Sequence, residues 1–164
     1  MQSNDVIKLV KLFEKNDITV WVDGGWCVDA LLGAITRSHS DLDIAVHHQN
    51  NTKLCELLGS IGYKQELRKD SSEWMYVMVD GLGKKVDVHV FEYDKDGKNI
   101  YGIEYPFGSL TGTGIIDGQE VKCINPEWMF KFKTAYQVKE KDLQDVQALS
   151  KKFGFALPSS YQID

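Results

Sequence analysis

The sequence predicts an α+β fold in which a mixed, partly antiparallel sheet is flanked by helices. The length of 164 residues suits one ordinary domain, and the 43% apolar and 26% charged content is that of a globular protein. Short β-branched stretches alternate with segments of helical periodicity. We find no repeat or linker, so we expect a single domain over residues 1–164, with an α+β core over about 1–124 and C-terminal helices over about 125–164 packed on it.

Composition excludes several classes of protein. No apolar run approaches the roughly eighteen residues of a membrane span, and the first residues lack the basic and apolar regions of a signal peptide. The formal charge of −5 argues against broad binding to nucleic-acid phosphates. Cys27, Cys55 and Cys123 match neither a zinc spacing nor a disulfide framework. We therefore expect a cytoplasmic protein with reduced cysteines, and neither a nucleic acid nor a membrane as partner.

Periodicity predicts the elements of the first part of the chain. Helices show apolar residues at i, i+3 and i+4, whereas strands are rich in β-branched and aromatic residues, and glycine often ends a helix. The expected elements are a helix over Val6–Lys15, a strand over Ile18–Val22, a turn at Gly24-Gly25, a short helix over Cys27–Leu32 ended by Gly33, a strand over Leu42–Val46 and a helix over Thr52–Ile61 ended by Gly62.

The second part begins with antiparallel strands and ends with helices. Asp and Gly pairs mark tight turns, and Asn followed by Pro marks a helix start. We expect strands over Tyr63–Leu67, Trp74–Val79 and Lys85–Phe91, a loop with irregular strands over Tyr101–Gly114, a hairpin turn at Asp117-Gly118 before a strand over Glu120–Ile124, and a helix from Asn125-Pro126-Glu127 to about Phe153, broken near Lys139–Lys141.

The strongest functional signal is the pair Asp41 and Asp43. Residues i and i+2 of a strand point to the same face, so both carboxylates lie on one side of a sheet while Leu42 packs on the other. Carboxylates held this close repel each other unless a positive charge lies between them. A divalent metal that carries a phosphorylated ligand is the simplest occupant.

A second strand offers a third carboxylate. Residues 86–90 alternate valine with Asp87 and His89, which share one face. An isolated strand aspartate is usually only a solvent-facing residue, but the neighbouring Asp-x-Asp strand favours a functional role. Three carboxylates on adjacent strands can hold two divalent ions, and Asp87 can also take a proton from an attacking hydroxyl.

The chain resembles the nucleotidyltransferase superfamily with the polymerase-β-like core. More narrowly, it is similar to the small antibiotic nucleotidyltransferases, which are the lincosamide enzymes and a branch of aminoglycoside enzymes. The order of a glycine pair, an Asp-x-Asp strand and a later strand aspartate carries the broad resemblance. The residues that carry the narrower one are Gly24-Gly25-Trp26, Arg37, His39 and Asp41-Leu42-Asp43, with weaker support from Asp87-Val88-His89 and Pro126-Glu127.

This resemblance implies transfer of a nucleoside monophosphate from an NTP to a drug hydroxyl, with release of pyrophosphate. It implies that Asp41 and Asp43 bind magnesium, that two ions are held, and that Asp87 is a third ligand or the general base. It also implies that the turn at Gly24 and Gly25 brings backbone N–H groups against the triphosphate, because glycine has no Cβ in the way. We expect ATP as the NTP.

Further residues are candidates for the same site. Arg37 can contact triphosphate oxygens, and Lys133 can reach the β- or γ-phosphate, with Lys139 as its competitor. His89 positions the acceptor hydroxyl, assists proton removal or only packs beside Asp87. Trp26 is a candidate for shaping the substrate site. His47-His48 is expected to be a solvated loop, not a metal pair.

The acceptor is predicted from charge and aromatic content. An acidic protein suits a cationic antibiotic, and aminoglycoside sites need many carboxylates, of which the region after Asp87 offers only Glu92, Asp94 and Asp96. Glu92 is therefore a candidate substrate contact, but the aromatic supply favours the less polar lincosamides. An aminoglycoside is the alternative acceptor, and a partner protein, as in antitoxin modules of the superfamily, is another. A homodimer that completes the drug pocket is also expected.

Overall fold

The computed structural model describes residues 1–135 and 140–161, and within them the strands form one mixed sheet between helices. The elements are α1 (Ser3–Lys15), β1 (Val20–Val22), α2 (Gly24–Leu32), β2 (Asp41–His47), α3 (His48–Ser60), β3 (Lys64–Glu66), β4 (Met75–Val79), β5 (Lys85–Tyr93), β6 (Asn99–Gly102), η1 (Ser109–Thr111), β7 (Gly112–Ile116), β8 (Gln119–Cys123), α4 (Pro126–Thr134), α5 (Glu140–Phe153) and η2 (Ser159–Tyr161).

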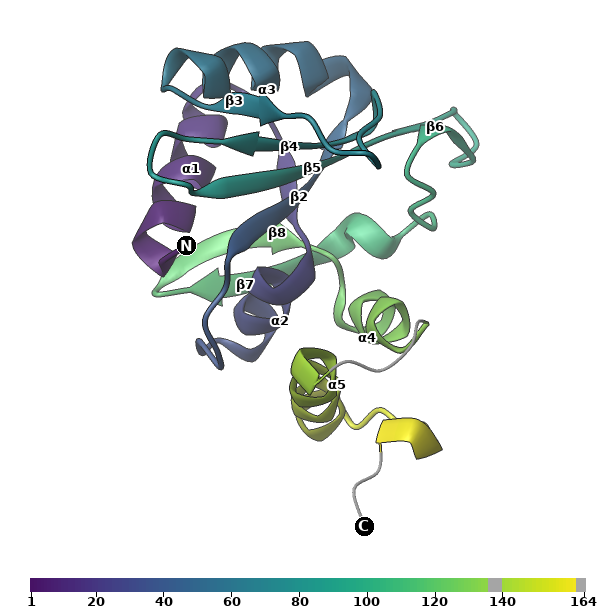
Figure 1. Cartoon of the computed structure of the whole chain (residues 1–164). Helices are drawn as coiled ribbons and strands as arrows, with labels where there is room; N and C mark the ends of the chain where they lie inside the picture. The colour runs from purple at the N-terminus through teal and green to yellow at the C-terminus, as the bar shows by residue number, and fades with distance from the viewer. Residues whose placement is uncertain (136–139, 162–164) are drawn as a thin grey trace.

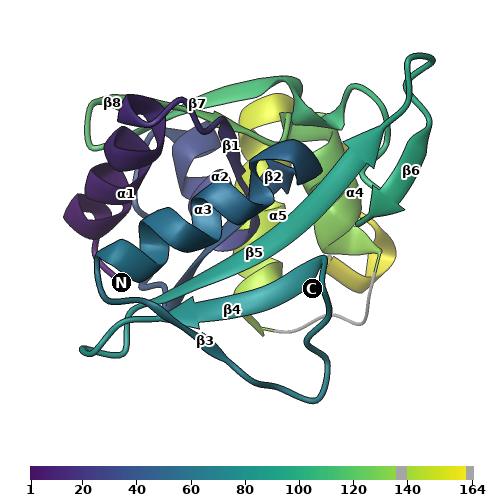
Figure 2. The same ribbon diagram turned by 90° about the horizontal axis from the view of Figure 1, so that it is seen from above.

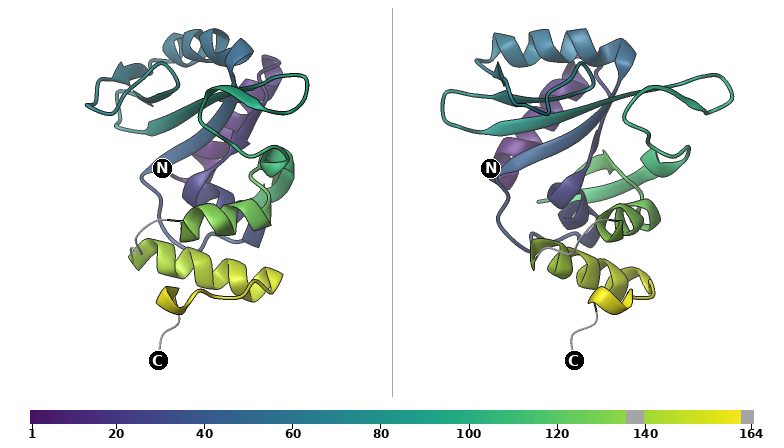
Figure 3. Two further views of the ribbon diagram at one scale, coloured as in Figure 1. Left: turned by 90° about the vertical axis from the view of Figure 1, so that its right-hand side faces the viewer. Right: turned by 45° about the vertical axis from the view of Figure 1, so that its right-hand side comes forward.

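The sheet is arranged around a parallel pair at its centre. Its strand order is β3-β4-β5-β2-β1-β8-β7, with β6 paired to β5. Strands β2 and β5 are parallel, whereas β4 pairs antiparallel with both β3 and β5, and β7 pairs antiparallel with β8. Helices α1 and α3 lie on one side of the sheet, and α2, α4 and α5 lie on the other (Figures 1 and 2). Figure 3 shows α5 as the layer farthest from α3. The predicted α+β class is confirmed.

Alternation along the central strands separates a dry face from a polar one. Leu42, Ile44 and Val46 of β2 and the valines at 86, 88 and 90 of β5 have no exposed surface. The intervening residues Asp41 and Asp43 of β2 and Asp87 of β5 are half-buried and lie on the opposite face. The predicted alternation of both strands is therefore confirmed, and it turns these three aspartates toward one side.

Several predicted helix boundaries are also confirmed. Gly33 ends α2 in the left-handed conformation, with φ of 70°. Asn125 caps α4, because its side-chain oxygen accepts a hydrogen bond from the Trp128 N–H at 3.0 Å, and Pro126 occupies the first turn. Among the described residues, no helix is long and apolar enough to cross a membrane.

Three helices begin earlier than predicted. Helix α1 begins at Ser3 and not at Val6, with Gln2 as its N-cap residue. Gly24-Gly25 is the first turn of α2 and not a turn before it, because the Asp23 carboxylate accepts a hydrogen bond from the Gly24 N–H at 2.7 Å. Helix α3 begins at His48 and not at Thr52, since the His47 ring accepts from the Gln49 N–H. The predicted solvated loop at His47-His48 is thus wrong. A capping side chain supplied a helix start that apolar periodicity does not mark.

Other boundaries differ in the second part of the chain. The region expected to be largely irregular, 101–114, contains the end of β6 and the start of β7. Helix α4 ends at Thr134 and α5 begins at Glu140, so the C-terminal segment forms two helices, as predicted. The predicted break near Lys139–Lys141 includes Lys139, which lies outside the described residues.

Candidate active site

The parallel register of β2 and β5 places Asp43 directly opposite Asp87. His89 lies two residues further along β5 on the same face. One ligand atom from each of Asp43, Asp87 and His89 lies within 4.8 Å of the other two. Asp41 shares this face at the start of β2 but is not part of that close group. The structure thus places the predicted Asp-x-Asp strand β2 next to β5, with His89 close to both Asp43 and Asp87.

Charge repulsion is strong in this cluster. Burial, followed by the negative charges of Asp23 and Asp41, raises the pKa of Asp43 to about 7. Burial also raises the pKa of Asp87, although the neighbouring His89 acts in the opposite direction. A bound divalent cation would lower the pKa of both Asp43 and Asp87, because it favours the ionised form of each carboxylate. Carboxylate oxygens with an imidazole nitrogen are a donor set that suits such an ion, so the residues fit a divalent metal.

The glycine pair lies against this cluster. Gly24 has φ of +58°, and a Cβ built there would overlap the Asp43 carboxylate. A Cβ at Gly25 would overlap the Arg37 guanidinium and the His39 ring. Because only glycine leaves this space free, the N-terminus of α2 can approach both the carboxylates and the cationic side chain. A helix N-terminus of this kind attracts phosphate groups.

Beside the glycines lies an open pocket of about 590 Å³. It brings together every described residue predicted to bind the nucleotide with the two aspartates of β2. Those residues are Gly24, Gly25, Arg37, Lys133, Asp41 and Asp43. Lys139, the predicted competitor of Lys133, lies outside the described residues. Asp142 of α5 also lines the pocket, which therefore combines two cations, a helix N-terminus and three carboxylates. Cations and a helix N-terminus suit the phosphates of a nucleoside triphosphate, and carboxylates suit its metal.

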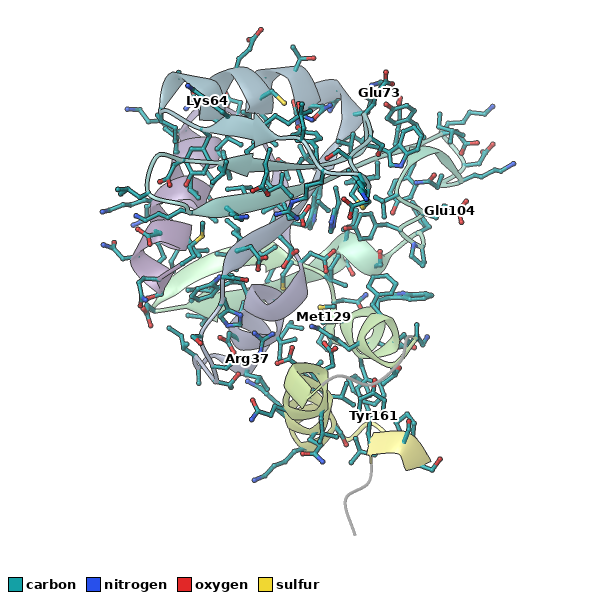
Figure 4. The ribbon with its side chains drawn as sticks, in the orientation of Figure 1. Arg37, Lys64, Glu73, Glu104, Met129 and Tyr161 are labelled. Carbon is teal, nitrogen blue, oxygen red and sulfur yellow. The ribbon has the colours of Figure 1, made fainter. Side chains whose placement is uncertain are left out.

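The two cations are held by carboxylates of α5. Asp145 binds Arg37 through two hydrogen bonds, of 3.0 and 2.9 Å, and also lies 3.0 Å from the Lys133 ammonium. Asp142 lies 3.2 Å from the same ammonium. Although burial acts to raise the pKa of Asp145, the Arg37 hydrogen bonds and the charge of Lys133 hold it below its usual value. Figure 4 shows Arg37 on the side of the molecule where α2 and α5 meet.

A buried chain of polar contacts continues from Arg37 into α2. The Arg37 guanidinium lies 3.1 Å from His39 Nδ1, and the other ring nitrogen of His39 lies 2.6 Å from the Asp29 carboxylate. Asp29 also accepts hydrogen bonds from the backbone and hydroxyl of Thr36. Trp26 is 2% exposed and packs on the His39 ring at 4.5 Å. Trp26 therefore contacts His39 but does not line the pocket beside the glycines.

Asp29, Asp142 and Asp145 are site residues that the sequence reasoning missed. Each is at most 2% exposed, in a helix with apolar residues on the same side. A signal existed for the two in α5, because positions 142 and 145 precede buried Leu149 at helical spacing. Aspartate on the packed stripe of a helix requires a buried cationic partner. Their partners, however, could not be identified from spacing alone.

His89 has contacts with buried residues as well as with Asp87. Its Nδ1 lies 3.2 Å from the Tyr105 hydroxyl and 3.6 Å from Asp23, and its Nε2 lies 3.6 Å from the Asp87 carboxylate. Burial acts to lower the pKa of His89, but the hydrogen bond and charge of Asp23 and the charge of Asp87 raise it overall. Tyr105 and Asp23 were also missed by the sequence reasoning.

Glu92 lies away from this group. Its carboxylate is 2.9 Å from the His48 ring at the start of α3, and α3 lies on the opposite side of the sheet from α2 (Figure 1). Its position in β5 has the alternation of the buried valines and not that of Asp87. The structure therefore does not bring this predicted substrate contact to the site.

Comparison with known proteins agrees with this geometry. A family model described as aminoglycoside-2''-adenylyltransferase matches residues 5–149. A lincosamide resistance protein of Staphylococcus haemolyticus is 31% identical over 91% of this chain and 98% of its own length. A 2''-aminoglycoside nucleotidyltransferase of Escherichia coli is 29% identical over 71% of this chain and 63% of its own length.

Solved structures agree as well. The lincosamide antibiotic adenylyltransferase LnuA, in its lincomycin-bound form, is 26% identical with a TM-score of 0.77, over 92% of this chain and 97% of that one. The complex of ANT(2")-Ia with adenylyl-2"-tobramycin has a TM-score of 0.75 at 20% identity, over 93% and 90% of the two chains, and shares the fold. This chain therefore belongs to the antibiotic nucleotidyltransferase family that includes the aminoglycoside-2''-adenylyltransferases and the lincosamide enzymes, with the polymerase-β-like fold of that family.

Proposed function

We propose that the protein transfers AMP from ATP to a hydroxyl of a lincosamide antibiotic, with release of pyrophosphate. The observation that carries the transferase chemistry is the pairing of Asp43 with Asp87 beside a pocket that holds Arg37 and Lys133. The lincosamide acceptor is supported by the extent of the match to the Staphylococcus haemolyticus protein, which covers 98% of that relative, against 63% for the Escherichia coli aminoglycoside enzyme.

In this proposal the nucleotide is bound by α2 and by the two cations. The N–H groups of the first turn of α2 donate hydrogen bonds to phosphate oxygens, and Arg37 and Lys133 bind the triphosphate. Asp41, Asp43 and Asp87 would hold the divalent metal, for which we propose two Mg²⁺ ions. When bound, the metal supplies neutralisation of the triphosphate charge and acidification of the attacking hydroxyl.

The chemical step is an in-line displacement at the α-phosphorus. Asp87 accepts the proton of the acceptor hydroxyl, whose oxygen forms the new bond while the bond to pyrophosphate breaks. His89, beside Asp87, positions that hydroxyl. Trp26 contributes by fixing His39 under Arg37. Glu92, which faces the other side of the sheet, has no part in this site.

The test is a mass-spectrometric assay with ATP, Mg²⁺ and either lincomycin, clindamycin or kanamycin. We expect an adenylylated product with the two lincosamides. The variant Asp87→Asn should form none, because it cannot take the hydroxyl proton, whereas Asp96→Asn, in an exposed turn, is the matched control and should retain activity. Full activity of Asp87→Asn would contradict the proposal that Asp87 is the general base.

An aminoglycoside is the second candidate acceptor, and the match to the aminoglycoside-2''-adenylyltransferase model favours it. Both acceptors share the nucleotide site, so they differ only in what binds beside His89. Modification of kanamycin alone would establish the aminoglycoside function and overturn the lincosamide proposal, while leaving the roles of the three aspartates in place.

A further inference from the structure

We propose that Tyr105 and Asp23 are positioning residues that hold the His89 ring against Asp87 and so set the rate of the chemical step. This inference rests on the proposed function. Neither residue lines the nucleotide pocket, and both contact His89 through Nδ1, the ring nitrogen farther from Asp87. Their role would be to fix the orientation of a ring that would otherwise rotate about its side-chain bonds.

Asp23 is anchored from two sides. One carboxylate oxygen accepts the Gly24 N–H at 2.7 Å, and the other accepts the Tyr105 hydroxyl at 2.7 Å. Its backbone N–H donates to the Asp43 carbonyl at 2.9 Å. Asp23 thereby links the start of α2 to strand β2 and to the loop that carries Tyr105. With both oxygens engaged, the carboxylate cannot turn away without losing a buried hydrogen bond.

Tyr105 is equally fixed. Its side chain is 4% exposed, and its ring packs edge-on against Phe91 at 5.7 Å and near Phe132 at 6.2 Å. Because a tyrosine hydroxyl has one hydrogen, and Asp23 receives it, the oxygen can only accept a hydrogen bond from His89. Nδ1 of His89, which lies 3.2 Å away, is therefore the donor.

The consequence for His89 is a defined ring orientation. With Nδ1 directed to Tyr105 and Asp23, Nε2 faces Asp87, at 3.6 Å from its carboxylate. A second hydrogen bond that fixes the orientation of a site histidine is a common device, because it determines which nitrogen faces the reacting groups. The side of the ring that meets the acceptor hydroxyl is thus set by residues that the acceptor never contacts.

The test compares two buried tyrosines that each lose one oxygen. Tyr105→Phe keeps the ring packing and removes the contact to His89. Tyr76→Phe is the matched control, since Tyr76 is 5% exposed and its hydroxyl donates to Asn51 at 2.6 Å, on the α3 side of the sheet. We expect Tyr105→Phe to lower kcat about tenfold, with both KM values within about twofold, and Tyr76→Phe to keep the wild-type kcat.

A second variant guards against loss of folding. Asp23→Asn keeps an oxygen for the Gly24 N–H and removes a negative acceptor for the other two groups, so it should lower kcat at least as far as Tyr105→Phe. Equal effects of Tyr105→Phe and Tyr76→Phe, or a change in acceptor KM with unchanged kcat, would overturn the proposal.

A readout that needs no turnover separates this proposal from the proposed function. The ring ¹⁵N resonances of His89, assigned with His89→Asn, should shift in Tyr105→Phe and stay unchanged in Tyr76→Phe. If the wild-type protein modified none of the three antibiotics, the proposed function would fail while this measurement still tested the contact. Unchanged His89 resonances in Tyr105→Phe would contradict the positioning role whatever the substrate.

Discussion

Gly24 shows how the absence of one side chain determines the geometry of the site. Its φ of +58° and its position against the Asp43 carboxylate each favour glycine, for different reasons. The first is a backbone preference that any positive-φ position has. The second is specific to the site, since a Cβ would have to push Asp43 out of its place opposite Asp87.

The variant Gly24→Ala should lose most of its transfer activity and about 1–3 kcal/mol of stability. The reason is that it combines backbone strain with overlap on Asp43. Gly118→Ala is the matched control, because Gly118 has φ of +82° but a Cβ added there would meet nothing within 4 Å beyond its chain neighbours. Denaturant unfolding and the transfer assay would check both. Wild-type activity in Gly24→Ala would show that the Asp43 carboxylate can move away from the added Cβ without loss of activity.

Asp43 also makes a prediction about pH. Its pKa is raised from 3.8 to about 7 in the folded protein. Between these two pH values, the native metal-free protein therefore holds a proton that the unfolded chain has released. Stability should therefore fall as pH rises from about 4 to about 7. Asp43→Asn removes this loss and should be more stable than wild type at about pH 8, by roughly 1 kcal/mol or more, while losing transfer activity. Urea unfolding in the presence of EDTA at several pH values measures the difference.

Contacts between helices give a second kind of prediction. Asp145 of α5 binds both Arg37 and Lys133 and is 1% exposed, so Asp145→Asn leaves two cations with too little negative charge. We expect a loss of about 2–4 kcal/mol and a raised KM for the NTP. Glu127→Gln breaks the exposed pair with Lys131 and should cost less than about 0.5 kcal/mol. Comparable losses in the two variants would contradict the buried role of Asp145.

The same pair predicts acid sensitivity. The pKa of Asp145 is lowered from 3.8 in the folded protein, so its contribution is complete above that value and is lost as pH falls through the lower folded value. Wild-type protein should therefore lose stability in this acidic range relative to Asp145→Asn. Thermal unfolding of both proteins at about pH 2 to 5 would show whether the stability difference between them shrinks as the pH falls. A constant difference in stability across this range would count against the assignment.

Strands were predicted more securely than helix boundaries, for a physical reason. Alternation is a local property, so the shared face of Asp41 and Asp43 and that of Asp87 and His89 follow from spacing alone. The starts of α2 and α3 depend on capping by Asp23 and His47, which periodicity does not detect. The same alternation places Glu92 with the valines of β5, so its separation from Asp87 could have been predicted.

The site required information that no local pattern holds. That Asp43 and Asp87 meet depends on the parallel register of two strands, which the sequence does not specify. The partners of Arg37, His39 and His89 lie on α5, on α2 and in the loop before η1, and nothing in their own segments identifies them. Strand alternation and the family resemblance pointed to Asp41, Asp43 and Asp87, whereas the residues that contact the site from other elements became visible only in the fold.

The whole chain should unfold as one unit. Helix α5 is joined to the rest by Asp145, and by the Lys152 ammonium, which donates to the Leu32 carbonyl at 2.8 Å. The Tyr161 hydroxyl donates to the carbonyl of Lys133. We therefore propose one domain and expect coincident thermal transitions by far-ultraviolet circular dichroism and tryptophan fluorescence. Two separate transitions would show that the C-terminal helices form an independent unit. The expected homodimer stays a prediction, which sedimentation velocity would test.

The link between Arg37 and Asp145 also has a consequence for synthesis on the ribosome. Arg37 is made 108 residues before its carboxylate partner. At about 5–20 residues per second, the guanidinium waits on the order of 5–20 s in the nascent chain before its partner exists. During that time the hydrogen bonds that Asp145 later accepts must be made to water or to other groups of the nascent chain. The pocket beside Gly24 and Gly25 is thus among the last parts of the protein to reach its final structure, although these two glycines are among the first residues to be translated.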